Sequence, residues 1–305
     1  MNPAVDLFGV TEELVDDGKS RCQSPSREAG GGGLNVARNL RRLGLDVLAV
    51  VPAGGLNGRQ LEQMLRDDGL PFESINTENE TRQNLAITER RSGRLIHFVF
   101  PGATLQESEW QQCLDVIGAV QPAPEFLVLS GSLPEGVPDD FYARAVRLAR
   151  QQGTKVVLDT SGRALLAPMQ EGVFLAKLNR REFGDLGYDG PDDYPSVLDA
   201  MGRRVEAGQA EALIVTLDAD GALLASRDGL RLHLRPPPTR VISHVGAGDS
   251  FVTVLVYQLQ RGLPLREAFQ YGVAAAAAKV NTAGNQLPGL EKVEGIFPLV
   301  AEQAL

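Results

Sequence analysis

The segment from Val245 to Ser250, near the end of the chain, combines residue types that could perform chemistry. Glycine and alanine precede the carboxylate of Asp249, and an apolar run from Phe251 to Leu259 follows directly. If that run is a helix, its first amides have no partner within the helix and lie at the positive end of its dipole, where anions bind. We therefore expect the amides to hold a phosphoryl group while Asp249 takes a proton from a hydroxyl group. The alternative is an ordinary acid in a first helical turn.

A run of four glycines, residues 30–33, precedes a second helix-like segment that begins at Leu34. Glycine lets the backbone approach a ligand closely, and Asn35, near the helix start, could hydrogen-bond a sugar hydroxyl. A dinucleotide-binding motif would need an apolar strand directly upstream, whereas residues 23–29 are polar. We therefore disfavour a nicotinamide enzyme, and a flexible turn remains the alternative to a ligand-binding loop.

Two smaller groups of polar residues have weaker signals. Asp6 could bind sugar hydroxyls, and Lys19 with Arg21 could bind a phosphate, although for these three residues alone a solvated charged surface is the favoured interpretation. Asn179 and Glu182 share one face of a helix and offer the oxygen ligands that suit Mg²⁺. Helix capping and surface pairing explain this second pair just as well.

Composition limits the class of protein. The chain of 305 residues is 43% hydrophobic with a formal net charge of −9, which fits one large α/β domain and argues against a nucleic-acid-binding surface. Cys22 and Cys113 match no metal-binding or redox spacing, which indicates a reduced, cytoplasmic protein. The acidic first twenty residues are not typical of a signal peptide, and no apolar run approaches the ~20 residues that span a bilayer.

Strand-like and helix-like segments alternate through most of the chain. Helices are expected over residues 141–148 and 192–207, and continuous apolar runs predict buried strands at 47–51, 126–129, 156–158, 174–176 and 213–217. This alternation is typical of a doubly wound, mainly parallel sheet with helices on both faces. A hairpin is expected at residues 223–234, around Asp228-Gly229.

Two regions depart from this rhythm. Residues 81–101 alternate apolar and polar around Ser92-Gly93, which predicts a hairpin with one wet face. Residues 6–29 are polar with scattered apolar positions and could supply further short strands. We expect both regions to form a small sheet inserted into a single domain of residues 1–305, as a candidate lid.

Taken together, these residues resemble the PfkB family of ribokinase-like carbohydrate kinases, over nearly the whole chain. The two signatures are the segment Gly30 to Asn39 and the segment Val245 to Phe251. Within the family the chain is most similar to the minor 6-phosphofructokinases and their tagatose-6-phosphate and fructose-1-phosphate kinase relatives. Five segments carry this similarity: residues 2–6, 18–22, 81–84, 100–103 and 130–134.

The resemblance implies a role for each candidate residue. Asp249 would be the general base, and the anion hole would consist of the amides of Gly246, Ala247 and Gly248. Sugar hydroxyls would be held by Asp6, Gly30, Gly31 and Asn35. The phosphate already on the sugar would meet Lys19, Arg82 and Ser132, with Arg21 close by. The ATP side would be lined by Lys177, Asn179, Thr216 and Gly221, and Mg²⁺ would be organised through water by Asn179 and Glu182.

The same resemblance implies a reaction and its alternatives. We expect ATP-dependent phosphorylation of fructose 6-phosphate to fructose 1,6-bisphosphate, with ATP, Mg²⁺ and a monovalent cation as cofactors, in a homodimer formed through the lid. Tagatose 6-phosphate or fructose 1-phosphate are alternative substrates. A kinase for a neutral sugar or nucleoside would need no cationic cluster, and a non-catalytic ligand-binding relative is the third alternative.

The chain departs from the family pattern at several positions. Relatives usually have a strand before the segment equivalent to residues 2–6, and here almost nothing precedes it. Asp218 stands where relatives have glycine in the ATP loop, and its charge would repel nucleotide phosphates. His97 replaces an arginine of the lid, and Thr253 and Val254 replace small residues behind the base.

Overall fold

The structure is a computed structural model that describes residues 1–282 and 287–304. Its main sheet has seven strands in the order β13-β12-β11-β10-β9-β8-β7. Strands β7 to β10 are parallel, and β11, β12 and β13 continue the sheet in antiparallel fashion. Their bounds are β7 Phe126–Ser130, β8 Lys155–Asp159, β9 Val173–Asn179, β10 Ala210–Thr216, β11 Ala222–Ser226, β12 Arg231–Arg235 and β13 Ala301–Glu302.

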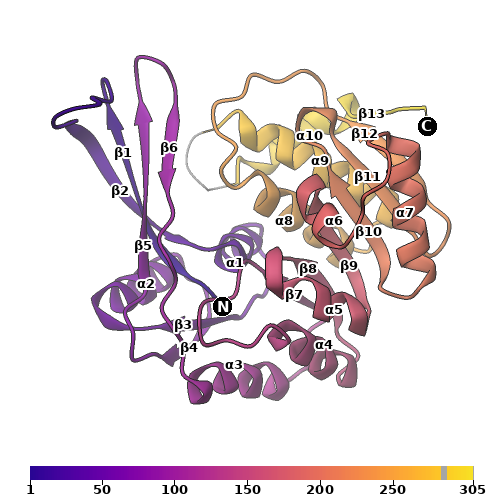
Figure 1. Cartoon of the computed structure of the whole chain (residues 1–305), viewed down its shortest axis with the longest axis horizontal. Coiled ribbons are helices and arrows are strands. Elements are labelled where there is room, and N and C mark those ends of the chain that lie inside the picture. Colours follow the sequence, from indigo (N-terminus) through magenta and orange to yellow (C-terminus); the bar gives the residue numbers. More distant parts are fainter. Residues whose placement is uncertain (283–286, 305) are drawn as a thin grey trace.

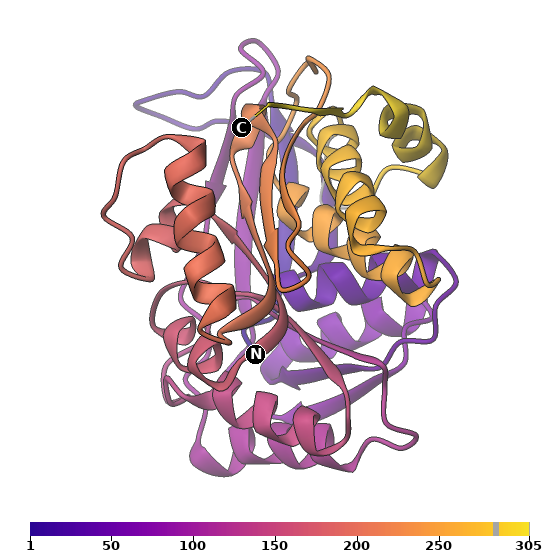
Figure 2. The same ribbon diagram turned by 90° about the vertical axis from the view of Figure 1, so that its right-hand side faces the viewer.

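Helices cover both faces of this sheet (Figure 2). The face that includes Val156 and Leu158 packs against α3 Glu107–Ala119, α4 Phe141–Gln151, α5 Leu166–Glu171, α6 Arg180–Asp185 and α7 Tyr194–Glu206. The face that includes Val157 packs against α1 Gly32–Arg42, α8 Ala247–Gln260, α9 Leu265–Val280 and α10 Leu290–Ile296. Three 3-10 turns complete this part: η1 Gly162–Ala164, η2 Asp218–Asp220 and η3 Phe297–Leu299.

The doubly wound α/β architecture expected from the sequence is therefore confirmed. Successive residues of a strand point to opposite faces, so a strand buried on both faces must be apolar throughout, as 156–158 is. The hairpin expected at 223–234 forms as β11 and β12. In the part of the chain that the structure describes, no helix is long and apolar enough to cross a membrane.

A second sheet stands beside the main body (Figure 1). It has four strands in the order β2-β1-β5-β6, with bounds β1 Ala4–Thr11, β2 Cys22–Gly30, β5 Arg82–Glu89 and β6 Leu95–Phe98. We call it the side sheet. It is built from the two regions that break the helix–strand alternation, as expected.

Residues 47–51 were expected to form a strand of the main sheet, but the strand found there belongs to a separate, two-stranded sheet. That run forms β3 Ala49–Ala53, which pairs in parallel with β4 Phe72–Asn76 through the crossover helix α2 Gly55–Asp67. Among the described residues β3 pairs only with β4, and β7 only with β8, so the parallel sheet is interrupted between β3 and β7. A cavity of about 680 Å³ lies there, lined mainly by apolar residues of β3, β7 and α1.

Candidate active site

Helix α8 begins at a glycine in a left-handed conformation. Gly246 is the N-cap residue with φ 77°, and its carbonyl oxygen accepts the hydrogen bond from the amide of Ser250 at 2.9 Å. Glycine adopts this conformation without the steric cost that a side chain would bring. The helix therefore starts at Ala247, and Asp249 lies in its first turn beside the free amides.

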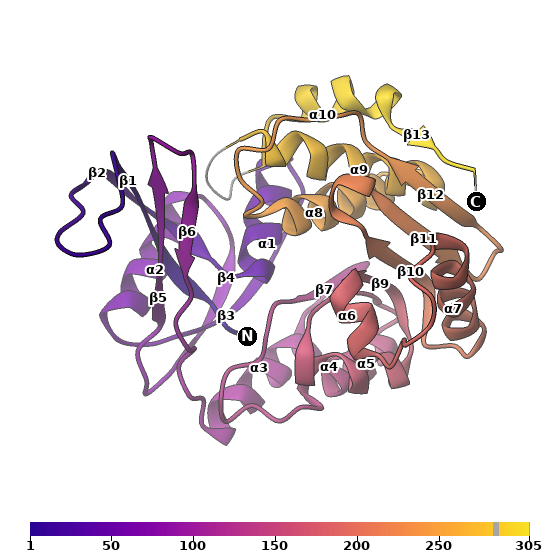
Figure 3. The same ribbon diagram turned by 45° about the horizontal axis from the view of Figure 1, so that its top comes forward.

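Helix α1 also starts at a glycine with positive φ, though not in the left-handed helical conformation, and it faces α8 (Figure 3). Its N-cap residue, Gly31, has φ 107°. Asn35, in the first turn of α1, donates a hydrogen bond from Nδ2 to Oδ2 of Asp249 at 2.7 Å. The two glycine-rich segments, 214 residues apart in the sequence, thus meet at the carboxylate of Asp249.

The environment of Asp249 favours its protonated form. Burial raises the pKa of this carboxyl and the charge of Asp159 raises it further, while the hydrogen bond from Asn35 and the charge of Lys177 lower it; the result is a pKa of about 6. Asp249 is therefore mostly ionised at neutral pH but holds a proton more readily than an ordinary aspartate does. Such a group suits a general base.

A buried ion pair lies next to the start of α8. Lys177 of β9 donates from Nζ to Oδ1 of Asp159 of β8 at 2.9 Å, and their side chains are 9% and 11% exposed. A Cβ atom on Gly248 would lie 2.9 Å from Lys177 Nζ, so the ammonium sits directly against the helix start. Burial lowers the pKa of Lys177, but Asp159, Glu182 and Asp249 together raise it above its ordinary value.

These groups surround a polar cavity of about 230 Å³. Of the residues expected from the sequence it is lined by Gly246, Gly248, Asp249, Lys177 and Glu182. Gly32, Ser130 and Gly131 were named only within motifs, and the lining residues that sequence reasoning missed are Asp159, Thr160 and Ser161. Asp159 ends a buried parallel strand, and ligands of open α/β sheets bind at the carboxyl ends of strands, so its position was a usable signal.

The residues expected on the ATP side lie on neighbouring strand ends. Asn179 of β9 is directly opposite Thr216 of β10. Gly221 follows η2 with φ 88°, and a Cβ there would lie 1.9 Å from the carbonyl oxygen of Leu234, so only glycine fits. Asp218 also has a positive φ, 52°, and its side chain is exposed.

Asn179 and Glu182 form a capping box at the start of α6. Asn179 Oδ1 accepts from the amide of Glu182 at 2.9 Å, and Glu182 Oε2 accepts from the amide of Asn179 at 2.7 Å. Burial raises the pKa of Glu182, against the lowering effects of the Asn179 amide and Lys177. The capping role is therefore present, and it fixes the side chain of Glu182 at the edge of the cavity.

The sugar side begins at Asp6 in β1. Its Oδ1 accepts from Asn84 Nδ2 of β5 at 2.8 Å, and a Cβ on Gly30 would lie 2.1 Å from its Oδ2. Gly30 is therefore required for the approach of β2 to this carboxylate. Burial raises the pKa of Asp6, partly offset by the hydrogen bond from Asn84. His97, opposite Ala86 on β6, is exposed.

Asn2, which sequence reasoning placed only in a family motif, connects two of the expected phosphate ligands. The guanidinium of Arg82 donates to the carbonyl oxygens of Asn2 at 2.9 Å and Phe100 at 3.0 Å. Ser132 Oγ accepts from Asn2 Nδ2 at 3.0 Å. Since a guanidinium has five N–H donors, Arg82 retains capacity for an anion beside Ser132.

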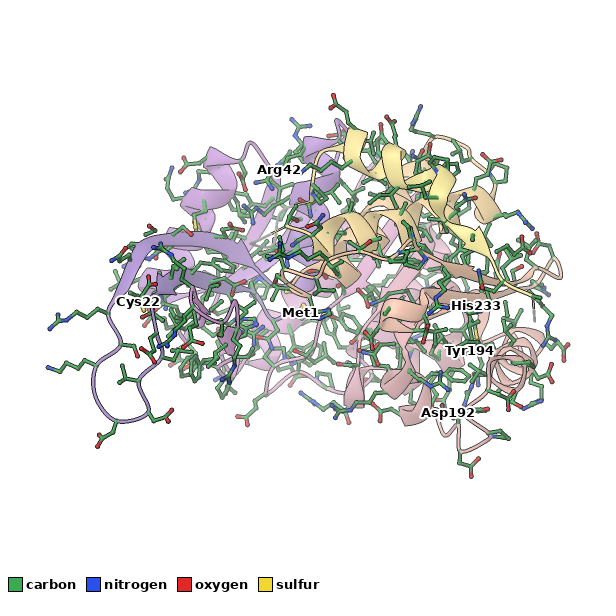
Figure 4. All side chains as sticks on the ribbon, turned by 90° about the horizontal axis from the view of Figure 1, so that it is seen from above. Met1, Cys22, Arg42, Asp192, Tyr194 and His233 are labelled. Carbon is green, nitrogen blue, oxygen red and sulfur yellow. The ribbon has the colours of Figure 1, made fainter. Side chains whose placement is uncertain are left out.

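Lys19 and Arg21 lie elsewhere. Both are exposed and belong to the loop beyond the last paired residues of β1 and β2, Thr11 and Cys22. Figure 4 shows Cys22 at the base of this loop, which projects away from the body. Asp6 is five residues back along β1, or about 16 Å at the usual strand rise. The grouping of Asp6 with Lys19 and Arg21 is therefore not reproduced within one chain.

The two residues behind the base are part of the core. Thr253 and Val254 are both 0% exposed. The hydroxyl of Thr253 donates to the carbonyl oxygen of Asp249 at 2.7 Å, so the polar group is satisfied within α8.

The chain is similar to known carbohydrate kinases over nearly its whole length. The model of the pfkB family carbohydrate kinases matches residues 1–292. The chain is 38% identical over 302 residues to the ATP-dependent 6-phosphofructokinase isozyme 2 of Mycobacterium tuberculosis, covering 99% of this chain and 88% of the relative. It is 30% identical over 301 residues to the 1-phosphofructokinase of Bacillus subtilis, covering 98% and 96%.

Among solved structures, phosphofructokinase-2 of Escherichia coli in complex with substrates and products is similar with a TM-score of 0.91. The two chains are 34% identical, with 98% of this chain and 96% of that chain covered. The same enzyme has also been solved in complex with potassium, and in a tetrameric inhibited form.

Proposed function

The chain belongs to the pfkB family of carbohydrate kinases and is an ATP-dependent kinase of sugar phosphates. We propose that its substrate is fructose 6-phosphate, which it phosphorylates at the 1-hydroxyl. The observation that carries the proposal is the half-buried Asp249 at a glycine-initiated helix start, held by Asn35 and close to Lys177. A base and an anion-binding site lie side by side there, as phosphoryl transfer to an alcohol requires.

The proposed step moves one proton and one phosphoryl group. Asp249 accepts the proton of the 1-hydroxyl as its oxygen bonds to the γ-phosphorus of ATP, while the bond from that phosphorus to the leaving oxygen of ADP breaks. The amides of Gly246, Ala247 and Gly248 stabilise the charge on the transferring group, and the Lys177 ammonium, against Gly248, adds to this. Mg²⁺, held through water near Asn179 and Glu182, would neutralise phosphate charge.

Asn35 holds the carboxylate of Asp249 in place, and we assign Asp6, Gly30 and Gly31 to the sugar hydroxyls. Arg82 and Ser132, joined through Asn2, are the proposed ligands of the 6-phosphate. Thr216 and Gly221, with Lys177 and Asn179, are proposed for ATP. The side sheet would act as the lid, because phosphoryl transfer needs water excluded from the acceptor position.

Two other sugar phosphates remain as alternative substrates, fructose 1-phosphate and tagatose 6-phosphate. The 1-phosphofructokinase relative supports the first. His97 stands where relatives of the phosphofructokinase type have arginine. It is exposed on the side sheet, and its charge acts on Asp6, so this replacement could change the position in which the phosphate of the sugar binds. A neutral sugar is disfavoured because it would leave the cationic group of Arg82 without an anion.

A coupled assay of ADP release across these three phosphates, fructose and ribose tests the proposal. We expect fructose 6-phosphate to give the highest kcat/KM, and the neutral sugars to fall about 100-fold lower because they lose two charge-assisted hydrogen bonds. Asp249→Asn should lower kcat about 100-fold or more while ATP still binds, and Asp185→Asn, an exposed carboxylate on α6, is the matched control.

Each other result has a definite meaning. Preference for fructose 1-phosphate or tagatose 6-phosphate would replace the substrate but keep the reaction. Equal turnover of neutral sugars would remove the phosphate site from Arg82 and Ser132. Near wild-type turnover by Asp249→Asn would remove the base assignment, and absence of any sugar-dependent ADP release would support the non-catalytic alternative.

A further inference from the structure

Lys279, in the last turn of α9, is a fully buried lysine with no ion-pair partner among the described residues. Taken as whole residues, three lysines and arginines in the described part of the chain are buried: Arg38 at 6%, Lys177 at 7% and Lys279 at 0% exposed. Arg38 pairs with Asp68, and Lys177 with Asp159. Because burial of an unpaired ammonium costs several kcal/mol, this lysine lowers stability, and its presence calls for a functional reason.

The ammonium binds backbone oxygen rather than a carboxylate. Lys279 Nζ donates to the carbonyl oxygen of Thr282 at 3.1 Å, and Thr282 in turn donates from its amide and hydroxyl to the carbonyl oxygen of Lys279 at 2.9 and 2.8 Å. The charge therefore lies at the carboxyl end of a helix, where the dipole is negative and carbonyl groups point outward. A small monovalent cation would find the same ligands attractive.

The same helix end is bonded to the segment that leads into the anion hole. The carbonyl oxygen of Val280 accepts from the amides of Ile242 and Ser243 at 2.7 and 3.1 Å, and Ser243 Oγ accepts from the amide of Val245 at 3.2 Å. The next residue, Gly246, caps α8. The position of the phosphoryl-binding amides thus depends mechanically on the turn that Lys279 closes.

The charge of Lys279 also acts on the site itself. Burial lowers the pKa of this lysine, while the carboxylates of Glu28 and Asp249 counteract the shift. Glu28 is directly opposite Asp6 in the side sheet, so the ammonium faces a region that already holds several negative charges. Phosphate groups of ATP and sugar would add more, which a fixed positive charge offsets.

We propose that Lys279 is a tethered cation that positions the phosphoryl-binding start of α8, so that this kinase needs no added monovalent cation. The inference rests on the proposed function and departs from the expectation of a monovalent-cation cofactor. An ammonium on a side chain carries the charge of K⁺ and, like it, binds carbonyl oxygens, but it cannot dissociate. Lys279 touches no substrate, and its role is positioning.

The test compares the full-length enzyme in buffers whose monovalent cation is either K⁺ or tetramethylammonium, at constant ionic strength. Wild-type turnover of the sugar phosphate should change less than about twofold between them. In Lys279→Met, kcat/KM for ATP should fall about tenfold in tetramethylammonium, and K⁺ or ammonium should restore part of it. Lys292→Met, an exposed lysine on the adjacent α10, should behave as wild type under both conditions.

Stability separates this role from a purely structural one. Since methionine is similar in size and removes a buried charge, the melting temperature of Lys279→Met should be unchanged or higher, although activity falls. If that variant does not fold, the comparison of wild-type turnover in K⁺ and in tetramethylammonium tests the proposal by itself. A tenfold rise of wild-type turnover on K⁺ would overturn the proposal, as would full activity of Lys279→Met without K⁺.

Binding gives a readout that does not depend on the substrate assignment. Calorimetry of a non-hydrolysable ATP analogue with Mg²⁺ should give the same affinity for the wild type in both buffers, and a K⁺-dependent affinity for Lys279→Met. If no sugar phosphate is turned over but this binding pattern holds, the proposed function fails and the role of Lys279 stands. Analogue binding by wild type that requires K⁺ would overturn the role of Lys279 alone.

Discussion

The hydrogen bond from Asn35 to Asp249 has two consequences for the proposed base. It orients the carboxylate between the two helix starts, and it stabilises the ionised form, which opposes the effects of burial and Asp159. Without it, a carboxylate so deeply placed would hold its proton at higher pH. The amide of Asn35 therefore adjusts the pH range in which Asp249 can accept a proton.

This gives a prediction for the pH dependence of turnover. Because the base must be ionised and its pKa is about 6, kcat/KM should rise with pH through about 6 and level off above it. In Asn35→Ala the ionised form loses its donor, so the rising limb should move to higher pH by about one pH unit. Asn76→Ala, at an exposed position of β4, should leave the profile where it was. An unshifted limb in Asn35→Ala would show that this bond does not tune the base.

The backbone conformation and the charge of Asp218 can each affect the proposed ATP loop, and the two effects can be separated. Its φ of 52° lies in the left-handed region, which aspartate tolerates better than most residues with a side chain. The backbone thus takes a shape that glycine would also take, and what differs is the carboxylate beside the proposed ATP loop. The charge therefore matters more than the geometry.

Asp218→Asn removes the charge and keeps the tolerance for this conformation. The KM for ATP should fall a few-fold, as expected for a loss of about 1 kcal/mol of repulsion near water, while the KM for the sugar phosphate stays constant. Steady-state kinetics with each substrate varied in turn measures both. Asp228→Asn in the β11–β12 turn is the control, and a KM for ATP that does not fall would show that the carboxylate points away from the nucleotide.

Among the elements, α8 has the most demanding placement. Its first turn must present free amides and Asp249 together, and its last turn ends at another left-handed glycine, Gly262, with φ 82°. A residue with a Cβ would therefore suffer similar backbone strain at Gly246 and at Gly262. Only the first end lies at the site, which allows a matched comparison within one helix.

We predict that Gly246→Ala and Gly262→Ala each lower stability by about 1 kcal/mol, or a few degrees in Tm for a chain of this size. Only Gly246→Ala should also reduce kcat, by about tenfold or more, because small displacements of positioned groups slow the reaction strongly. Calorimetric melting and the ADP-release assay measure the two effects. Equal losses of kcat in both variants would mean that the start of α8 has no special role.

At the scale of the whole molecule, apolar residues are exposed on the side sheet, in its β1–β2 loop and in the segment that follows β6. Val15 is 51% exposed, Phe98 49%, Val99 61% and Phe100 53%. Three of these residues, 98–100, are consecutive at the end of β6. Exposed apolar surface of this kind favours a protein partner, and the proposed partner is the side sheet of a second copy. Lys19 and Arg21, remote from the site of their own chain, would then lie at the interface between copies.

Phe98→Glu should weaken this association because a charge would be buried in the proposed interface. We expect the wild type to be a dimer by light scattering, and the dissociation constant of the variant dimer to be about tenfold higher or more. Leu166→Glu, at a residue that is 51% exposed on α5, is the control outside the sheet. A monomeric wild type, or a variant with unchanged mass at all concentrations, would contradict the lid-mediated dimer.

Much of the fold could be predicted because it depends on local periodicity. Residues 156–158 are apolar without interruption, and the structure buries Val157 on one face of the sheet and its neighbours on the other. The alternation around Ser92-Gly93 likewise gave the β5–β6 hairpin. The pairing of β3 could not be predicted in this way, because an apolar run says that a strand is buried but not which strand lies beside it.

The sequence by itself predicted the chemistry proposed for Asp249, because a helix start with glycines and an acid is a local motif that brings free amides and a carboxylate together. Only the tertiary structure decided which distant groups surround it: Asp159 lines the same cavity, Asn35 bonds to the carboxylate, and the charge of Lys279 acts on Asp249. It also separated Lys19 and Arg21 from Asp6, since an extended hairpin carries residues close in sequence far apart in space. Local patterns are set by neighbours along the chain, whereas charges and hydrogen bonds act through space and depend on strand order and helix packing.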